Sequence, residues 1–420
     1  MPRSTDEAGA GVEQAAALLG RLLDGVEREL PHAVELRRQL HAEPELAHAE
    51  ERTAARIAAE LPVACEIVAG TGRLARVECG GEHKHERQGT SAVAVRAELD
   101  GLPMRERTGA PFAATGEAMH ACGHDVHMAA LVALTRAAHE LRETLPAPLL
   151  AVFQPSEEAY PSGAQELAAS SPEGDGALAA HAPAAVVAAH VHPELPWGAV
   201  ALDAGIVNAS CDAVEITVAG EPSHGAYPHR GRDPILALAQ IVVALHAQLA
   251  RRIDPLHPAS LTVGVIKGGS AENVIPARAH ARAALRAYQP EDRLALRALV
   301  EEVAHGVAAA HGCRAEVRLV PGEPALENDP AIVARARALL ARAGLTAAAE
   351  WRSCGSDDFA FFGALAPVAM AFVGLAGADG FRPRPLHHPE LLPPDEAVGA
   401  VARTQALLYA AAAATTRADA

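Results

Sequence analysis

Four short apolar runs most constrain what this chain can fold into, and the first three are each followed at once by polar or charged residues. They span residues 92–97, 149–153, 186–191 and 368–375. Helical periodicity lies between them, for example at 128–141, where apolar residues recur on one stripe. Because strands that alternate with helices form parallel sheets with helices on both faces, the pattern predicts an α/β domain built on a mainly parallel sheet.

The middle of the chain has a different rhythm and predicts an inserted α+β domain. In order, we expect a strand at 214–218, a helix from Asp233-Pro234 to Ile253, strands at 261–265 and 281–288, a helix from Pro290 to Gly312 and a strand at 314–320. The order β-α-β-β-α-β is typical of ferredoxin-like units. We therefore place one domain at 1–208 and 321–420, and the inserted domain at 209–320.

Charge and length exclude some classes of protein. The 420 residues carry a net charge of −16, and binding to nucleic acid would need clustered Lys and Arg instead. No run of 18 uninterrupted apolar residues occurs, and the N-terminus lacks the apolar core of a secretory signal, so we expect no membrane span. Six scattered cysteines without paired spacing predict free thiols and a cytoplasmic location.

Four segments carry candidate metal ligands. They are MHACGHDVH (119–127) with Cys122, His124, Asp125 and His127; AVFQPSEEA (151–159) with Glu157 and Glu158; AAHVHPELPWG (188–198) with His190 and His192; and RPLHHPE (384–390) with His387 and His388. Thiolate, imidazole and carboxylate suit zinc and neighbouring divalent ions. A further pair, His83 and His85, lies in a polar stretch that we interpret as a solvated surface loop.

Taken singly, each segment has a simpler interpretation. The first is compatible with a buried cysteine and a helix-capping histidine, and the paired glutamates with solvated loop acids. The joint pattern decides between these readings, since three strand ends of one predicted domain offer compatible ligands. Ligands of open α/β sheets bind outside the carboxyl ends of the strands, so a metal site is the better hypothesis.

Further collinear motifs make the chain resemble the M20 metallopeptidase-like amidohydrolases, in the branch of hippurate hydrolases, N-acyl-amino-acid amidohydrolases and auxin-conjugate hydrolases. The resemblance runs from about residue 34 to 400. Besides the segments above, it rests on LRRQLHAEPEL (36–46), VRAELDGLPMRERTG (95–109), PSHGAYPHRGRDP (222–234), GGSAENVIP (268–276) and GSDDFAFF (355–362).

The resemblance implies a catalytic α/β domain with two divalent metal ions (Mn, Zn, Co or Ni) and an inserted lid that dimerises. Cys122 would bridge the ions, His124 and His190 would complete one, and Glu158 and His387 the other. Glu157 would be the general base. Asp100 and Asp125 would support the ligands from behind.

On the lid, the resemblance gives three further roles. His224 would stabilise the oxyanion, in related enzymes at the partner's site, while Asn273 and Arg286 would hold the substrate. The expected activity is hydrolysis of N-acyl-L-amino acids, of the aminoacylase type. The alternatives are an M20-type dipeptidase or carboxypeptidase, and a catalytically silent ligand-binding relative.

Three residues depart from the family pattern. Glu98 stands where Asp is usual, His192 where Trp is common, and His388 follows His387 where the family has Ser. The last departure makes His388 a rival ligand, although the position after Pro-Leu favours His387. No departure removes a ligand, so we expect activity to be retained and the acyl preference to be affected.

Overall fold

The computed structural model describes residues 5–80, 91–168 and 176–414, and divides the chain into two compact units. The first comprises the described residues of 1–205, 327–351 and 361–420, and the second comprises 206–326 and 352–360. The predicted insertion at 209–320 falls within the second unit, which also takes in the short segment 352–360. His83 and His85 lie outside the described residues.

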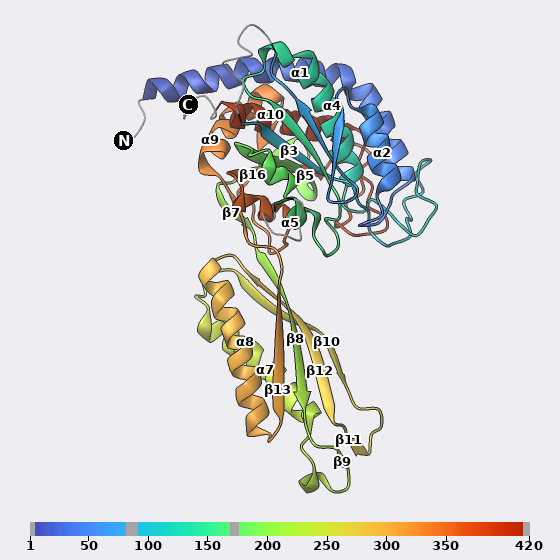
Figure 1. The fold of residues 1–420 in the computed structure, drawn as a ribbon, viewed down its shortest axis with the longest axis vertical. Helices are drawn as coiled ribbons and strands as arrows, with labels where there is room; N and C mark the ends of the chain where they lie inside the picture. Colours follow the sequence, from blue (N-terminus) through green and yellow to red (C-terminus); the bar gives the residue numbers. More distant parts are fainter. Residues whose placement is uncertain (1–4, 81–90, 169–175, 415–420) are drawn as a thin grey trace. The chain divides into compact units, whose positions relative to one another are not determined.

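The first unit is built on an eight-stranded sheet of order β1-β2-β4-β3-β5-β16-β6-β15 (Figure 1). The strands are β1 (Cys65–Val68), β2 (Gly72–Val77), β3 (Val93–Glu98), β4 (Leu149–Gln154), β5 (Ala185–Pro196), β6 (Ala199–Ala201), β15 (Thr346–Ala347) and β16 (Val368–Ala376). The four central strands, β4, β3, β5 and β16, are mutually parallel. They correspond to the four apolar runs, so the predicted mainly parallel α/β sheet is confirmed.

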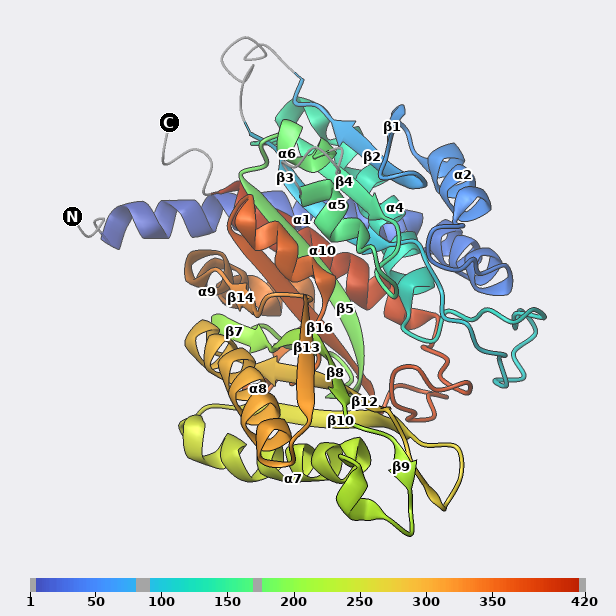
Figure 2. The ribbon, with the colours of Figure 1, turned by 60° about the horizontal axis from the view of Figure 1, so that its bottom comes forward.

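Helices bury the sheet on both faces, as the unbroken apolar runs require. The helices of this unit are α1 (Thr5–Ala42), α2 (Glu51–Glu60), α4 (His124–Glu140), α5 (Gly163–Ala168), α6 (Ala177–Ala180), α9 (Pro330–Leu339) and α10 (Glu396–Ala413). On β3, Val93 and Val95 join a core shared with α1, α4 and α10, and the alternate residue Ala94 is equally buried. Figure 2 shows α1 and α10 passing behind the strands.

Two boundaries differ from the sequence-based prediction. Helix α4 begins at His124 rather than near Met128, because Gly123 adopts φ +85° and starts the helix immediately after Cys122. A side chain at Gly123 would also collide with Val191 at 2.5 Å. Strand β5 continues to Pro196 instead of ending near His190, since β16 pairs with it well past that residue.

The second unit has the predicted order β-α-β-β-α-β. Its elements are β8 (Ser210–Ala219), α7 (Pro234–Arg252), β10 (Ala259–Gly268), β12 (Arg278–Ala287), α8 (Pro290–Ala310) and β13 (Arg314–Pro321). A separate two-stranded ribbon pairs β9 (Ser223–His224) with β11 (Val274–Ile275). The sheet order is β10-β12-β8-β13, with antiparallel neighbours. Asp233 caps α7 through the N–H groups of Ile235 and Leu236, as predicted. Strands β7 (Gly205–Asn208) and β14 (Leu326–Asn328) lie where the chain passes between units.

Helices α7 and α8 cover one face of this second sheet (Figure 1). Among the described helices, α7 is the one long and apolar enough to cross a membrane by length and composition, and 28% of the tested window is buried. Its buried side chains, including Leu238, Ile241 and Leu245, pack on the sheet, and this packing accounts for part of its apolar character.

A buried ion-pair network ties α1 to α4 in the first unit. The Nε atom of Arg37 donates to Asp125 Oδ2 at 2.7 Å, and His41 Nδ1 lies 2.9 Å from the same oxygen. Arg37 also donates to Asp395 at the start of α10, at 3.0 Å. Burial opposes ionisation of Asp125, but Arg37 and His41 outweigh it and hold the pKa of Asp125 far below its usual range.

We predict that Asp125→Asn lowers the free energy of unfolding by about 3 kcal/mol, because it leaves a buried guanidinium short of its counter-charge. A depressed folded-state pKa contributes stability that is present above the unfolded-state pKa, about 4, and lost as the pH falls below it. Urea unfolding at pH 7 and pH 3 should therefore show a larger difference between wild type and variant at pH 7.

The matched control is Glu140→Gln, since Glu140 of α4 also pairs with α1, through Arg28 at 2.6 Å, but on the exposed surface. That variant should change stability by less than about 1 kcal/mol. Equal effects of the two substitutions would show that burial does not set the strength of the Asp125 pair.

Candidate metal centre

Five of the predicted ligands converge at the carboxyl ends of β3, β4 and β5. Donor atoms of Cys122, His124 and His190 lie within 4.8 Å of one another, and so do those of Cys122, Glu158 and His387. Cys122 belongs to both groups, which is the arrangement that a bridging ligand requires. Glu157 joins His124 and Glu158 in a third such group.

Asp100, two residues beyond the end of β3, organises the two glutamates. Its Oδ1 accepts the backbone N–H of Glu157 at 3.1 Å, and its Oδ2 accepts that of Glu158 at 2.9 Å. Ser156, just before them, has φ +50°, which marks the tight turn at this strand end. The turn separates the glutamates: Glu158 Oε1 lies 3.3 Å from His387 Nε2, and Glu157 Oε2 lies 3.8 Å from His124 Nε2.

Hydrogen bonds fix which nitrogen of each histidine can bind a metal. His124 Nδ1 lies 2.8 Å from the carbonyl oxygen of Asp100, and His190 Nδ1 lies 2.7 Å from that of Val191. Both Nδ1 atoms are therefore donors, so the lone pair of each neutral ring is on Nε2. His190 Nε2 in turn lies 3.5 Å from Cys122 Sγ.

The electrostatics of the two rings differ. Burial lowers the pKa of His124, but Glu98, Asp100 and Glu158 outweigh it and raise that pKa above its usual value. Burial, reinforced by His127, holds the pKa of His190 well below its usual range, so this ring is neutral at pH 7. A cation among these carboxylates would take the place of the proton that they favour on His124.

His387 and not His388 joins the cluster. The backbone N–H of His387 donates to Ala121 at 2.9 Å, which anchors the loop beside Cys122, and His387 itself has φ +62°. His388 turns away, and its Nδ1 accepts the backbone N–H of Glu390 at 3.1 Å. Loop geometry thus places His387, and not His388, within the cluster.

The two acids expected behind the ligands behave differently. Asp100 contacts the ligand residues as described, whereas Asp125 is paired with Arg37 and His41 of α1. Sequence reasoning missed two contacts of His127 that support the backbone beside His190. His127 Nδ1 lies 2.8 Å from Glu98, and His127 Nε2 accepts the backbone N–H of Val191 at 3.0 Å. The presence of Glu98 and His127 within the quoted motifs was the available signal.

The donor set fits divalent metal ions on an observation independent of any motif. His124 Nε2 is buried and makes no hydrogen bond to any other described residue. Buried polar atoms are rarely left without a partner, so this nitrogen, which faces the carboxylates of Glu157 and Glu158, fits a role as a metal ligand. Sulfur, imidazole and carboxylate together suit Zn, Co, Ni and Mn.

In the second unit, the structure brings His224 and Asn273 together and separates Arg286 from them. His224 pairs with Val274 in the two-stranded β9–β11 ribbon, and the N–H of Gly225 donates to the carbonyl of Asn273 at 2.7 Å. Arg286 lies near the far end of β12, where it donates to the carbonyl of Cys354 at 2.9 Å. Eight residues of strand separate Arg286 from Arg278, a span of roughly 26 Å.

Curated relatives of similar length match most of the chain. An N-acetylcysteine deacetylase of Bacillus subtilis is 31% identical over 371 residues, covering 87% of this chain and 92% of the relative. An N-acetyldiaminopimelate deacetylase of Bacillus pumilus is 32% identical over 370 residues, covering 87% and 94%.

Solved structures agree with the architecture described above. A dinuclear metal-binding peptidase of the M20 family from Bacillus subtilis superposes with a TM-score of 0.77 at 27% identity, covering 91% of this chain and 98% of that one. A putative aminohydrolase from methicillin-resistant Staphylococcus aureus gives a TM-score of 0.83 at 26% identity, with coverage of 93% and 98%. The model of peptidase family M20/M25/M40 matches residues 94–411, which contain all five converging ligands. The chain is therefore a metal-dependent amide hydrolase that belongs to peptidase family M20/M25/M40.

Proposed function

We propose that this enzyme hydrolyses the amide bond of N-acyl-L-amino acids to a carboxylate and a free amino acid, with two divalent ions bound per subunit. The observation that carries the proposal is the convergence of Cys122, His124, Glu158, His190 and His387 beside Glu157. The deacetylase relatives named above act on N-acetylated amino acids, which favours the same substrate class here. The six cysteines form no disulfide bonds, which supports a reducing, cytoplasmic location.

The contacts support the following ligand roles. Cys122 would bridge the ions, with His124 and His190 on one side and Glu158 and His387 on the other. When bound, such a pair of ions supplies Lewis acidity and an acidified water. Glu157 belongs to neither of the two ligand groups that contain Cys122, and its carboxylate faces His124. It accepts the proton of the attacking water and passes it to the departing amine.

The separation within the second unit supports catalysis by two subunits. A single N-acyl-amino acid is too short to reach both Arg286 and the β9–β11 ribbon of the same lid, because roughly 26 Å of strand separates them. We therefore propose that Arg286 binds the substrate carboxylate, while His224 and Asn273 serve the partner's site. His224 Nδ1 accepts the N–H of Ala226 at 3.0 Å, so its Nε2 carries the proton that can stabilise negative charge on the carbonyl oxygen.

A surface suited to a second copy of the chain lies on the same unit. Strand β10 forms one edge of the lid sheet, and the neighbouring helix α7 exposes Leu236 and Val243, which are 50% and 70% accessible. Two such edges related by a two-fold axis can pair into one continuous sheet and cover both helices. The alternative occupant, a membrane surface, would leave the protein monomeric in detergent-free buffer.

The function is tested with a substrate panel on protein loaded separately with Mn²⁺, Zn²⁺, Co²⁺ or Ni²⁺. We expect turnover of N-acetyl and N-benzoyl amino acids and little cleavage of unblocked dipeptides. Cleavage of the dipeptides alone would establish the peptidase alternative. No turnover of any substrate by the fully metallated protein would establish the silent ligand-binding relative.

The general base provides the internal control for that panel. Glu157→Gln keeps the size of the side chain and removes proton acceptance, so kcat should fall at least roughly 100-fold while metal content stays at the wild-type level. Glu158→Gln should instead lower metal content. The opposite pattern would mean that the two glutamates exchange roles.

We predict that Cys122→Ala loses most of both metal ions, because one thiolate serves both ligand groups. Metal content is measured by mass spectrometry after dialysis against metal-free buffer. Cys79→Ala is the matched control, since Cys79 is another cysteine of the first unit and equally buried, at 7% accessibility. Full occupancy by two ions in Cys122→Ala would exclude the bridging role.

Action of His224 on the partner's site is tested by mixing two inactive variants, His224→Ala and Glu157→Gln, under conditions that allow subunit exchange. In a mixed dimer, trans action leaves one site intact, and a 1:1 mixture should recover roughly a quarter of the wild-type rate. Action within one chain leaves a lesion at every site, so the mixture would stay inactive. Light scattering on the same samples must show a dimer, and a monomeric wild type would contradict the proposal.

A further inference from the structure

The face of the lid sheet opposite α7 and α8, here called the open face, carries charged residues in register. On β8 the side chains of Glu215, Thr217 and Ala219 alternate with the buried Ile216 and Val218, so they point to this face. Each has a neighbour on β12 and another on β13, at a strand spacing of about 4.8 Å. The result is a set of three-residue rows that run across β12, β8 and β13.

One row contains a carboxylate between its two arginines. Glu215 lies between Arg282 of β12 and Arg318 of β13. Its carboxylate oxygens are 3.8 Å from Arg282 Nε and 3.3 Å from Arg318 Nη1. A single carboxylate is thus shared by two guanidinium groups that reach toward it from opposite sides.

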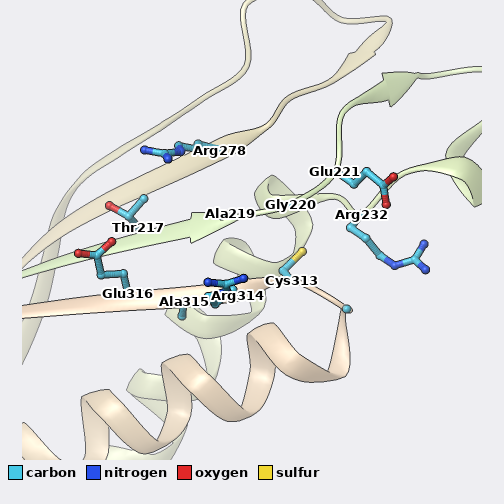
Figure 3. A pocket seen from close by; sticks show the side chains of 11 residues that line it. Thr217, Ala219, Gly220, Glu221, Arg232, Arg278, Cys313, Arg314, Ala315 and Glu316 are labelled. Atoms are coloured by element: carbon cyan, nitrogen blue, oxygen red, sulfur yellow. The ribbon is translucent and has the colours of Figure 1, made fainter.

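A second row repeats the two arginines without the acid. Arg278 of β12 and Arg314 of β13 flank Ala219, which is four residues from Glu215 along the same face. Across the part of the chain that the structure describes, no carboxylate forms an ion pair with Arg278 or Arg314. The small side chain of Ala219 leaves a hollow, and these residues line a cavity of about 720 Å³ (Figure 3).

A third guanidinium group is held at the same cavity. The backbone of Arg232 pairs with that of Glu221 in both directions, at 2.9 Å each. Its side chain passes over Gly312, which has φ +68°, and a Cβ there would lie 2.7 Å from Arg232 Cδ. The glycine that ends α8 therefore also leaves the space that Arg232 occupies.

The acids of the cavity do not fill the hollow over Ala219. Glu316 lies one row further along β13, opposite Thr217, and Figure 3 shows its carboxylate beside Thr217. Glu221 lies beyond Gly220, outside the row. The space between Arg278 and Arg314 thus has the positive charge of the Glu215 row without its carboxylate.

We propose that the hollow over Ala219 is a binding site for a small organic carboxylate, held between Arg278 and Arg314 as the carboxylate of Glu215 is held between Arg282 and Arg318. Arg232 lies at the same cavity and adds to its positive charge. Guanidinium groups suit carboxylates because they offer paired N–H donors in one plane. The site lies on the lid, uses none of the metal ligands, and does not depend on the proposed substrate of the metal centre.

The test measures succinate binding to the metal-loaded full-length protein by isothermal titration calorimetry at low ionic strength. Arg278→Ala combined with Arg314→Ala should weaken binding at least tenfold. The matched control, Arg282→Ala combined with Arg318→Ala, removes two arginines of the same face and should leave the affinity within about threefold. Added salt should weaken wild-type binding, since the site is open to solvent.

A single substitution tests the hollow itself. Ala219→Glu would supply the missing carboxylate from within, as in the Glu215 row, and should abolish succinate binding while metal content and the circular dichroism spectrum stay unchanged. The proposal is overturned if succinate binds equally to all variants, which would place it at the metal centre. It is also overturned if the wild type binds inorganic sulfate but not succinate.

Discussion

The candidate metal centre depends on one buried carboxylate, that of Asp100. The two oxygens of this carboxylate accept the N–H groups of Glu157 and Glu158. The backbone carbonyl oxygen of Asp100 accepts the Nδ1 proton of His124. One residue at the end of β3 thereby sets the direction of two glutamates at the end of β4 and the tautomer of a histidine on α4. Burial raises the pKa of Asp100, although the nearby His124 and the N–H groups of Glu158 and Glu157 act in the opposite direction.

The cluster illustrates how an α/β sheet separates rigid positioning from reactive groups. Cys122 and His124 lie at the start of α4, where the packed core fixes the backbone. His190 lies within β5, while Glu158 and His387 lie in the loops that follow β4 and β16. Around them, a second set of buried contacts orients the rings, as the carboxylate of Glu98 does for His127 and His127 for the backbone beside His190. Such supporting contacts are what hold metal ligands to a narrow range of geometries.

The second unit distributes the residues that we propose to be functional along a sheet rather than gathering them. His224 and Asn273 lie at the β9–β11 ribbon, at one end of the sheet, while Arg286 lies at the other end of the sheet, close to the segment 352–360. The strand length between them is fixed by the pairing of β12 with β8 over ten residues. A rigid sheet of this kind can present different residues to different subunits, and this constraint underlies the proposal of catalysis by a dimer.

Periodicity in the sequence determined the class of the fold and the β-α-β-β-α-β insertion, because both depend on local alternation. The motifs supplied candidate metal ligands, and the family resemblance selected five of them. The position after Pro-Leu already favoured His387 over His388, and the structure adds the hydrogen bond from the loop to the carbonyl of Ala121. Local patterns also gave no sign of the pairing of Asp125 with Arg37, which lies 88 residues away on α1.

Only the tertiary structure brought Arg278 and Arg314 to either side of Ala219, because strand register is set by pairing across the sheet and not by any spacing along the chain. The same holds for the distance between His224 and Arg286. The sequence alone therefore determined which side chains are available for the candidate sites. Their grouping into sites was decided by the long-range pairing of strands and the packing of helices against them.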